Sequence, residues 1–528
     1  MLRIVFLLLV SLTVAAQDQY PTKSIEPYYD LNFTDAERDS LKGNLESLQK
    51  DLQALHQYKM ENSVGMSIKF DPKPAGFKIP AGITASNWIL PKDVQLPANK
   101  EELAFYPVYK LAVLIRNKKI TSTELTQLYI KRIKKYSDTL QCVISLLEDR
   151  AMAAAKKADE EIAKGKYKGP LHGIPYGVKD LLAVEGTKTT WGAAPFKDQT
   201  INKTAEVVKR LDDAGAILIC KFTMGSLAMG DIWYGGVTKN PWNMKQGSSG
   251  SSAGSASGTA AGLVAFSIGT ETLGSIVSPS TRCGTSGLRP TYGVVSTDGA
   301  MTLSWTMDKI GPICRSALDC GLVLNVLASI NAAPKELKVA YFKAKYSGND
   351  SISLHVIRKL GYNPVEVEMP KDIPVSAIRI MLSAEAGAAF DFLTRENIDD
   401  QLTDQRKWAW PNTFRASRFI PAVDYVNASR ARAQLIEEYH AKLGQYDVII
   451  SPSFAGTQLL TTNLTGHPCL VVPNGFNKEG GPTSISFLGK LYGEAAIVAF
   501  AKAYQEASEW EEKIPPLFAV HLPFTNIH

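Results

Sequence analysis

Apolar residues between positions 120 and 220 follow two alternating patterns, helical spacing and short continuous runs. Thr121, with Glu124 three residues later, predicts a capping box that opens a helix over residues 125–135. The same patterns predict helices over 149–164 and 207–214 and strands over 176–178 and 216–220. Strands that alternate with helices indicate an α/β protein with a large mixed, mostly parallel sheet covered by helices on both sides.

The pattern changes in the second half of the chain. Strands are predicted over 338–342 and 364–368 with a helix over 353–360, then a mostly helical stretch up to 446, then apolar strand-like runs at 447–450 and 468–473. We interpret 345–445 as a variable, mostly helical insert within a main domain over 105–515. We expect this insert to contain elements that determine substrate specificity.

The N-terminal part of the chain has a different character. Residues 1–16 combine a basic start, a seven-residue apolar run and small residues, which is typical of an export signal cleaved near Ala16. Residues 17–104 are expected to form an amphipathic helix over 35–62 and a proline-rich extended arm over 71–107. The sequence therefore predicts an exported protein, periplasmic or secreted.

Composition excludes several classes of protein. The 528 residues are 45% hydrophobic and 21% charged, which is ordinary globular usage. A net charge of +6 without a Lys/Arg block argues against a nucleic-acid partner. After the signal, no stretch reaches the roughly 18 apolar residues that a membrane span needs. Six cysteines without a CxxC pair argue against structural zinc, and we assign neither a disulfide nor an oligomeric state.

The segment 247–290 is rich in glycine and serine, yet it is not a flexible linker. It contains the apolar run 262–269, which must be buried. Upstream, Lys179 lies between apolar residues, after the strand-like run 176–178. The glycines and serines of the segment therefore have positional roles in an ordered structure.

Lysine and serine spacing resembles that of the amidase signature family. Ser275 follows Ser251 by 24 residues, the family's spacing, and Lys179 precedes both. The resemblance covers roughly residues 105–510 and implies that Ser275 is the nucleophile and Lys179 the base. It also implies a cis peptide bond between Gly250 and Ser251, which would aim the Ser251 hydroxyl between the other two groups as a proton relay.

This chemistry requires a neutral lysine. A serine hydroxyl needs a base to remove its proton, and a free lysine, with a pKa of about 10.4, is charged at neutral pH. Burial among apolar groups lowers the pKa of a lysine, so Lys179 in the sheet interior could act as the base. The alternative is a partly exposed Lys179 that pairs with Asp180.

Residues 269–276, Gly-Thr-Glu-Thr-Leu-Gly-Ser-Ile, resemble the family's nucleophile motif. The resemblance implies that the backbone N–H groups of Thr272, Leu273, Gly274 and Ser275 form an oxyanion hole, with the Ala228 carbonyl lining the same pocket. Such donors typically contribute a few kcal/mol each in the transition state.

Four positions depart from the family's pattern. Leu273 replaces a glycine, and a leucine with positive φ would be strained. Glu271 occupies a position where the family has an aspartate, Val277 one where it has an arginine, and Arg282 one where it has an aromatic residue. Arg282 is a candidate replacement for the missing arginine.

Two other motifs compete with this interpretation. Residues 250–254 fit the G-x-S-x-G nucleophile elbow with Ser252 as nucleophile, but the preceding segment is not an apolar strand. Ser47 and Lys50 fit S-x-x-K, but they lie in a charged helix without the companion motifs. The histidines available to an elbow enzyme are His355, His440, His467 and His521.

The sequence predicts an exported amidase that cleaves the C–N bond of a small-molecule or peptide carboxamide through an acyl-enzyme on Ser275, without metal or cofactor. A non-catalytic binding protein on the same fold and an amidotransferase A-type subunit stay open as alternatives. Aromatic candidates for an acyl pocket are Trp191, Trp233, Trp408 and Trp410.

Overall fold

The computed structural model describes residues 21–57, 61–64, 68–77, 88–328 and 332–519. The chain divides into two compact units, 1–64 and 65–528. The first unit contains two 3-10 turns and the helix α1 (Asp35–Gln57), which is shorter than the predicted 35–62. The predicted export signal, 1–16, lies outside the described residues.

The second unit is built on a sheet of eleven strands among the described residues, ordered β1-β3-β2-β8-β10-β9-β14-β15-β13-β11-β12. The strands are β1 (Val143–Leu146), β2 (Pro175–Lys179), β3 (Ile217–Phe222), β8 (Phe266–Glu271), β9 (Ser286–Arg289), β10 (Lys309–Cys314), β11 (Val339–Phe342), β12 (Val365–Val367), β13 (Val448–Pro452), β14 (Cys469–Phe476) and β15 (Pro482–Gly489). The α/β class and the mixed sheet are as predicted. Parallel pairing occupies two blocks, β3-β2-β8 and β13-β11-β12, while the strands between them pair antiparallel.

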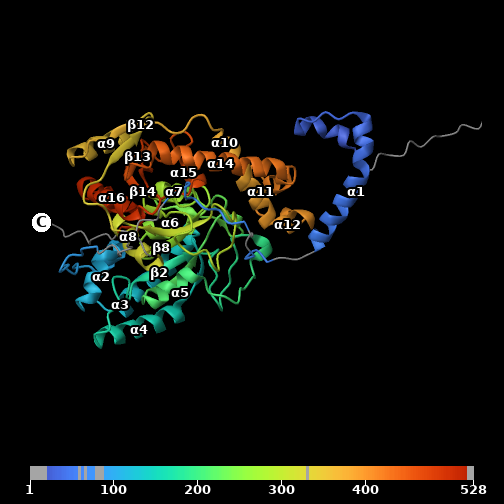
Figure 1. Ribbon diagram of the computed structural model, residues 1–528. Helices are drawn as coiled ribbons and strands as arrows, with labels where there is room; N and C mark the ends of the chain where they lie inside the picture. Colours follow the sequence, from blue (N-terminus) through green and yellow to red (C-terminus); the bar gives the residue numbers. More distant parts are fainter. Residues whose placement is uncertain (1–20, 58–60, 65–67, 78–87, 329–331, 520–528) are drawn as a thin grey trace, which may run out of the picture. The chain divides into compact units, whose positions relative to one another are not determined.

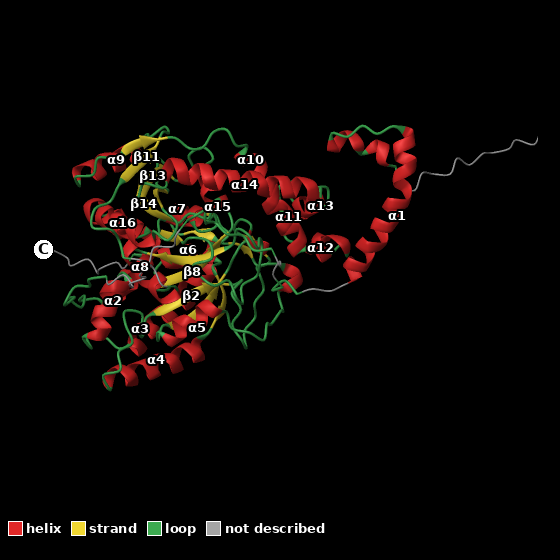
Figure 2. Ribbon diagram, in the orientation of Figure 1, coloured by secondary structure: helices red, strands yellow, loops and turns green. Residues whose placement is uncertain are grey.

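Helices cover both faces of the sheet (Figure 2). Ile313 of β10 packs against α6 (Ala253–Ala260) and α7 (Val277–Cys283). Its neighbour Cys314 belongs to the core that includes α8 (Ala317–Leu327). Successive residues of a strand point to opposite faces, so these helices lie on opposite sides. The remaining helices near the sheet are α2 (Val108–Arg116), α3 (Ser122–Leu140), α4 (Glu148–Ala163), α5 (Glu206–Asp213) and α16 (Glu494–Ser508).

Local sequence signals account for several boundaries. The capping box at the start of α3 is present, since the Thr121 hydroxyl accepts from the Glu124 amide and the Glu124 carboxylate accepts from the Thr121 amide, both at 3.0 Å. The proline-rich arm is coil from 88 to 99, but it then forms the 3-10 helix η3 (Lys100–Phe105), because Asn99 caps it. Residues 78–87 of the arm lie outside the described residues.

The region 345–445 carries α9 (Asn349–Lys359), α10 (Val375–Ile378), α11 (Ile380–Ala389), α12 (Asp391–Arg395), α13 (Trp410–Ser417) and α14 (Ala422–Leu443) (Figure 1). Within the described part of the chain, no helix is long and apolar enough to cross a membrane. All six cysteines are buried free thiols.

Candidate active site

Lys179 ends β2 and is fully buried. Its Nζ donates to the Ser251 hydroxyl at 2.7 Å, to the Thr270 hydroxyl at 2.9 Å and to the Ser252 hydroxyl at 3.3 Å. Asp180 instead pairs with the buried Lys221 at 2.9 Å. The alternative of a partly exposed Lys179 paired with Asp180 is therefore wrong. The three hydrogen-bond partners of the Lys179 amine are all hydroxyl groups.

Burial sets the charge of this lysine. Desolvation lowers the pKa of Lys179 from 10.5 to about 7, while the Asp308 and Glu271 carboxylates oppose the shift. A substantial fraction of the amine is thus neutral near pH 7. It can then accept a proton from the hydroxyl that it contacts.

Ser251 lies at the entry to α6, after a two-stranded ribbon of β6 (Lys239–Asn240) and β7 (Asn243–Gly247). The peptide bond between Gly250 and Ser251 is cis, as the resemblance implied. A side chain on Gly250 would place its first carbon 1.8 Å from the Gly230 carbonyl oxygen, so only glycine fits there. The Ser251 carbonyl accepts from the Gly225 amide at 3.3 Å, which joins this turn to the 225–228 loop.

Ser275 lies just before α7, and its carbonyl accepts from the Ser252 amide at 3.2 Å. The two serine segments are thereby held side by side, 24 residues apart in the chain. Exposure rises from 0% for Lys179 through 1% for Ser251 to 8% for Ser275. Ser275, the residue expected to attack the substrate, is thus the most accessible of the three residues.

The turn from Thr272 to Ser275 has the form of an anion site. Among the described residues, its backbone N–H groups have no hydrogen-bond acceptor. The positive φ of the turn, +83°, falls on Gly274, and Leu273 is not among the non-glycine residues with positive φ. The strain expected from a leucine here is therefore absent. The Thr272 hydroxyl donates to the partly buried Asp308 carboxylate at 2.6 Å, which anchors the turn.

Comparison with known proteins identifies the family. A family model named Amidase matches residues 124–352. The A subunit of the glutamyl-tRNA(Gln) amidotransferase from Geobacillus thermodenitrificans is 30% identical over 482 residues, which cover 78% of this chain and 99% of the relative. The chain belongs to the amidase signature family. The corresponding protein from Nitrosomonas europaea is 29% identical, over 77% of this chain and 98% of the relative.

Solved amidase structures share the fold. The native peptide amidase from Stenotrophomonas maltophilia is 27% identical, with a TM-score of 0.69 over 78% of this chain and 98% of that one. A bacterial aryl acylamidase of the amidase signature family aligns with a TM-score of 0.68 at 20% identity, over 78% of this chain and 98% of that one, which shows the common fold. The protein is accordingly an amidase, a hydrolase that acts on amides.

In this amidase, Glu271 organises the start of α7. Its carboxylate accepts from the Ile276 amide at 2.9 Å and from the Val277 amide at 3.0 Å, and it pairs with Arg289 at 2.8 Å. Burial alone would raise the pKa of Glu271, but the Arg289 guanidinium beside it lowers it to about 2. The carboxylate is therefore ionised at all working pH values and fixes the helix that follows Ser275.

The amidase does not use Arg282 to replace the family's arginine in this network. Arg282 is exposed and donates to the Gln246 side chain at 3.1 Å, while Val277 is fully buried. The cation beside Glu271 is Arg289. Neither Asp308 nor the role of Arg289 was predicted from the sequence, although both residues lie within the range 105–510 that resembles the family.

Ala228 lies in the 3-10 turn η5 (Ser226–Ala228), where Leu227 and Ala228 have φ of +48° and +66°. Two of the aromatic candidates hold this turn. The Leu227 amide donates to the Trp191 carbonyl at 3.0 Å, and the Trp410 indole donates to the Leu227 carbonyl at 2.9 Å. Trp408 is 66% exposed and takes no part in these contacts. Trp233 is partly buried against Tyr234.

The nucleophile-elbow alternative has no support in the contacts of Ser252. The Ser252 hydroxyl is buried and donates to the Thr270 carbonyl at 3.1 Å. His467 contacts Thr465, and burial lowers its pKa to about 3. His521 lies outside the described residues. Ser47 and Lys50 of the other competing motif are exposed on α1.

Proposed function

We propose that this amidase hydrolyses a carboxamide through an acyl-enzyme on Ser275, with Lys179 as the base and Ser251 as the proton relay. The observation that carries the proposal is the 2.7 Å hydrogen bond between a fully buried lysine amine and the Ser251 hydroxyl. A neutral amine at this distance can take the relay's proton as the relay takes the nucleophile's.

Lys179, Ser251 and Ser275 carry the proton transfers of the proposed reaction. The Ser275 oxygen bonds to the substrate carbonyl carbon, its proton passes to Ser251, and the Ser251 proton passes to Lys179. The backbone N–H groups of Thr272 to Ser275 stabilise the oxyanion. Collapse of the tetrahedral intermediate breaks the C–N bond, and the leaving nitrogen takes the proton back through Ser251. Water then attacks the ester along the same relay and releases the acid.

The proposed substrate is a peptide or other extended amide. Peptide amidases are among the structures similar to this chain at 27–28% identity, which supports this class. The test is ammonia release from a panel of peptide amides and simple amides, with Ser275→Ala as the control. The proposal requires release by the wild-type protein and none by the variant. Release that survives Ser275→Ala would contradict it.

The two alternatives make different predictions for the isolated chain. A binding protein would release no ammonia. An amidotransferase A-type subunit, which is what the Nitrosomonas europaea relative is, would depend on partner subunits for its full activity. Turnover by the purified chain alone favours the free amidase. The absence of a Lys/Arg block on the +6 chain supports the same choice.

We also propose that the protein is exported, with the signal cleaved near Ala16. The support is the charge and hydropathy pattern of residues 1–16. N-terminal sequencing of the protein from its natural host tests this. A mature chain that begins near Gln17 is expected, and a chain that keeps Met1 would contradict export by cleavage.

A further inference from the structure

Two cavities meet beside the helix that follows Ser275. The larger one, of 1450 Å³, is lined in part by Ser453, Gln458 and Ser484, and the smaller one, of 540 Å³, in part by Ser249 and Ser278. Residues that line both are Thr281, Phe454 and Pro482. Because these residues are shared, the two cavities adjoin, and we call them together the α7 groove.

The α7 groove approaches the oxyanion turn. A first side-chain carbon on Gly274 of the oxyanion turn would lie 3.3 Å from Leu459 and 3.5 Å from the Ser278 hydroxyl. Leu459 follows Gln458, on the wall of the larger cavity, and Ser278 lines the smaller one. The larger cavity also lies at the carboxyl ends of the parallel strands β11, β12 and β13, where open α/β sheets commonly bind ligands.

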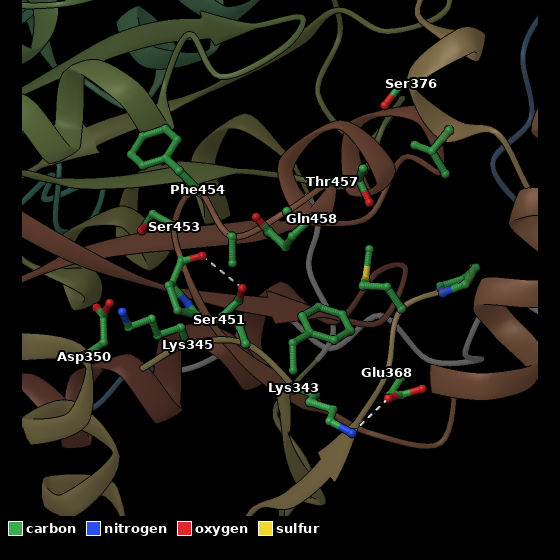
Figure 3. Close-up of a pocket in the computed structure, with 18 of the residues that line it drawn as sticks. Lys343, Lys345, Asp350, Glu368, Ser376, Ser451, Ser453, Phe454, Thr457 and Gln458 are labelled. Atoms are coloured by element: carbon green, nitrogen blue, oxygen red, sulfur yellow. Dashed lines mark hydrogen bonds and ion pairs between the residues drawn. The ribbon is translucent and has the colours of Figure 1, made fainter. Parts of the chain in front are cut away.

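Gln458, the first residue of α15 (Gln458–Leu464), is the unusual group in this wall. Its side chain is 1% exposed, and neither its Nε2 nor its Oε1 has a hydrogen-bond partner among the described residues. Figure 3 labels it among the lining residues, with Ser453, Phe454 and Thr457. Buried amides are nearly always paired, since an unmade hydrogen bond in the interior is costly. The Gln458 carboxamide therefore keeps a donor and an acceptor that the described protein does not use.

Several other polar groups of the wall pair with one another. The Ser484 hydroxyl bonds those of Thr281 at 2.6 Å and Ser453 at 2.8 Å. At the rim, the Glu368 carboxylate pairs with both Lys343 and Lys371 (Figure 3 draws the Lys343 pair). The buried Gln458 carboxamide thus offers unused hydrogen-bonding capacity, which suits a ligand that carries both a donor and an acceptor.

We propose that the α7 groove binds an extended, peptide-like part of the substrate, and that the Gln458 carboxamide pairs with one of its secondary amide groups. Its Nε2 would donate to the substrate C=O and its Oε1 would accept from the substrate N–H, the two groups that every peptide unit carries. The exposed Phe454, 54% accessible, provides an apolar surface for a neighbouring substrate side chain. The inference rests on the proposed function, because it assigns a binding surface and a contact residue to the peptide-like substrate of the Ser275 site.

The kinetic test compares Gln458→Leu with the wild-type protein and with Gln127→Leu, a control at an exposed position of α3. The substrates are benzamide and N-acetylated peptide amides of one to four residues. For the wild type, kcat/KM should rise with peptide length. Gln458→Leu should lower kcat/KM for the longest amide about 10- to 100-fold relative to benzamide, and the control should not change this ratio. The proposal would be overturned if the wild-type kcat/KM did not depend on peptide length, or if Gln458→Leu left the ratio of kcat/KM for the longest amide to that for benzamide unchanged.

Stability separates a ligand role from a structural one. An orphaned buried amide contributes nothing to folding, so Gln458→Leu should keep or raise Tm. A fall of more than about 5 °C, with equal loss on all substrates, would show that Gln458 serves the fold.

Binding to the Ser275→Ala protein tests the groove without turnover. In that background, Gln458→Leu should weaken the binding of an acetylated tetrapeptide amide about tenfold or more, measured by calorimetry. Equal affinity would refute the groove even if amidase activity is confirmed. A lost affinity without ammonia release from any amide would instead support the groove and refute the proposed reaction.

Discussion

Lys179→Met removes the amine while keeping a flexible apolar side chain of similar length. Burial holds the pKa of Lys179 at about 7 rather than 10.5. At about 1.4 kcal/mol per pKa unit, the wild-type fold therefore carries a cost of about 4–5 kcal/mol at pH 7. The variant escapes this cost but loses three hydrogen bonds, each worth about 1 kcal/mol. We expect it to be about 1–2 kcal/mol more stable than the wild type at pH 7.

The sign of the pH dependence follows from proton binding. Between pH 7 and 10.5 the unfolded chain holds a proton on Lys179 that the folded chain has released, so the wild type gains stability from this group as pH rises. The variant lacks this gain. The difference between the two proteins should therefore change by about 4 kcal/mol across that window. Urea unfolding of both proteins at several pH values measures it.

Lys179→Met should lower the reactivity of Ser275 although it raises the stability of the fold. The rate at which a fluorophosphonate labels Ser275 needs no knowledge of the substrate. For the wild type it should fall tenfold per pH unit below about pH 7, as Lys179 becomes protonated. Lys179→Met should be at least about 100-fold slower and show no such limb. Labelling within tenfold of the wild type, or a stability difference that is constant with pH, would refute the role of a neutral buried lysine.

Two further substitutions test the surroundings of the nucleophile. Ser251→Ala should lower the labelling rate and kcat by about 100- to 1000-fold without unfolding the protein, because the proton relay is lost while the surrounding fold remains. Activity near the wild-type level, with an unchanged circular dichroism spectrum, would exclude the relay. Glu271→Gln should destabilise the fold by about 3–5 kcal/mol in urea unfolding at pH 7, because it leaves Arg289 buried without its counter-charge, whereas the exposed Glu160→Gln should not. The low pKa of Glu271 adds stability that is present above pH 4.5 and is lost as pH falls through about 2. Glu271→Gln should therefore lose less unfolding free energy on acidification than the wild type. Identical acid unfolding curves for the two proteins would contradict this.

The positions of Lys179, Ser251 and Ser275 could be inferred from sequence because the family's spacing is local: the two serines flank one helix and one strand. The helices and strands near residues 120–220 could be predicted for a similar reason, since caps and apolar runs are short-range signals. Leu273 looked strained only because sequence cannot say which residue of a turn takes the positive φ. In the fold, Gly274 takes it.

Long-range contacts escaped prediction. Asp308 reaches Thr272 because β10 pairs with β8 and sets Lys309 opposite Glu271, a register that no local pattern encodes. Trp410 reaches Leu227 from 183 residues away. The antiparallel centre of the sheet has the same origin, since strand order depends on which apolar faces pack together rather than on the runs themselves.

The central claim is that Ser275 is the nucleophile of a Lys179–Ser251–Ser275 relay. Peptide mapping by mass spectrometry after fluorophosphonate labelling tests it most directly, because the method reports which oxygen forms the covalent bond. The account predicts one adduct per chain, on Ser275, that is lost in Ser275→Ala and strongly slowed in Lys179→Met. An adduct on Ser252 or another serine, or labelling that persists in Ser275→Ala, would contradict it.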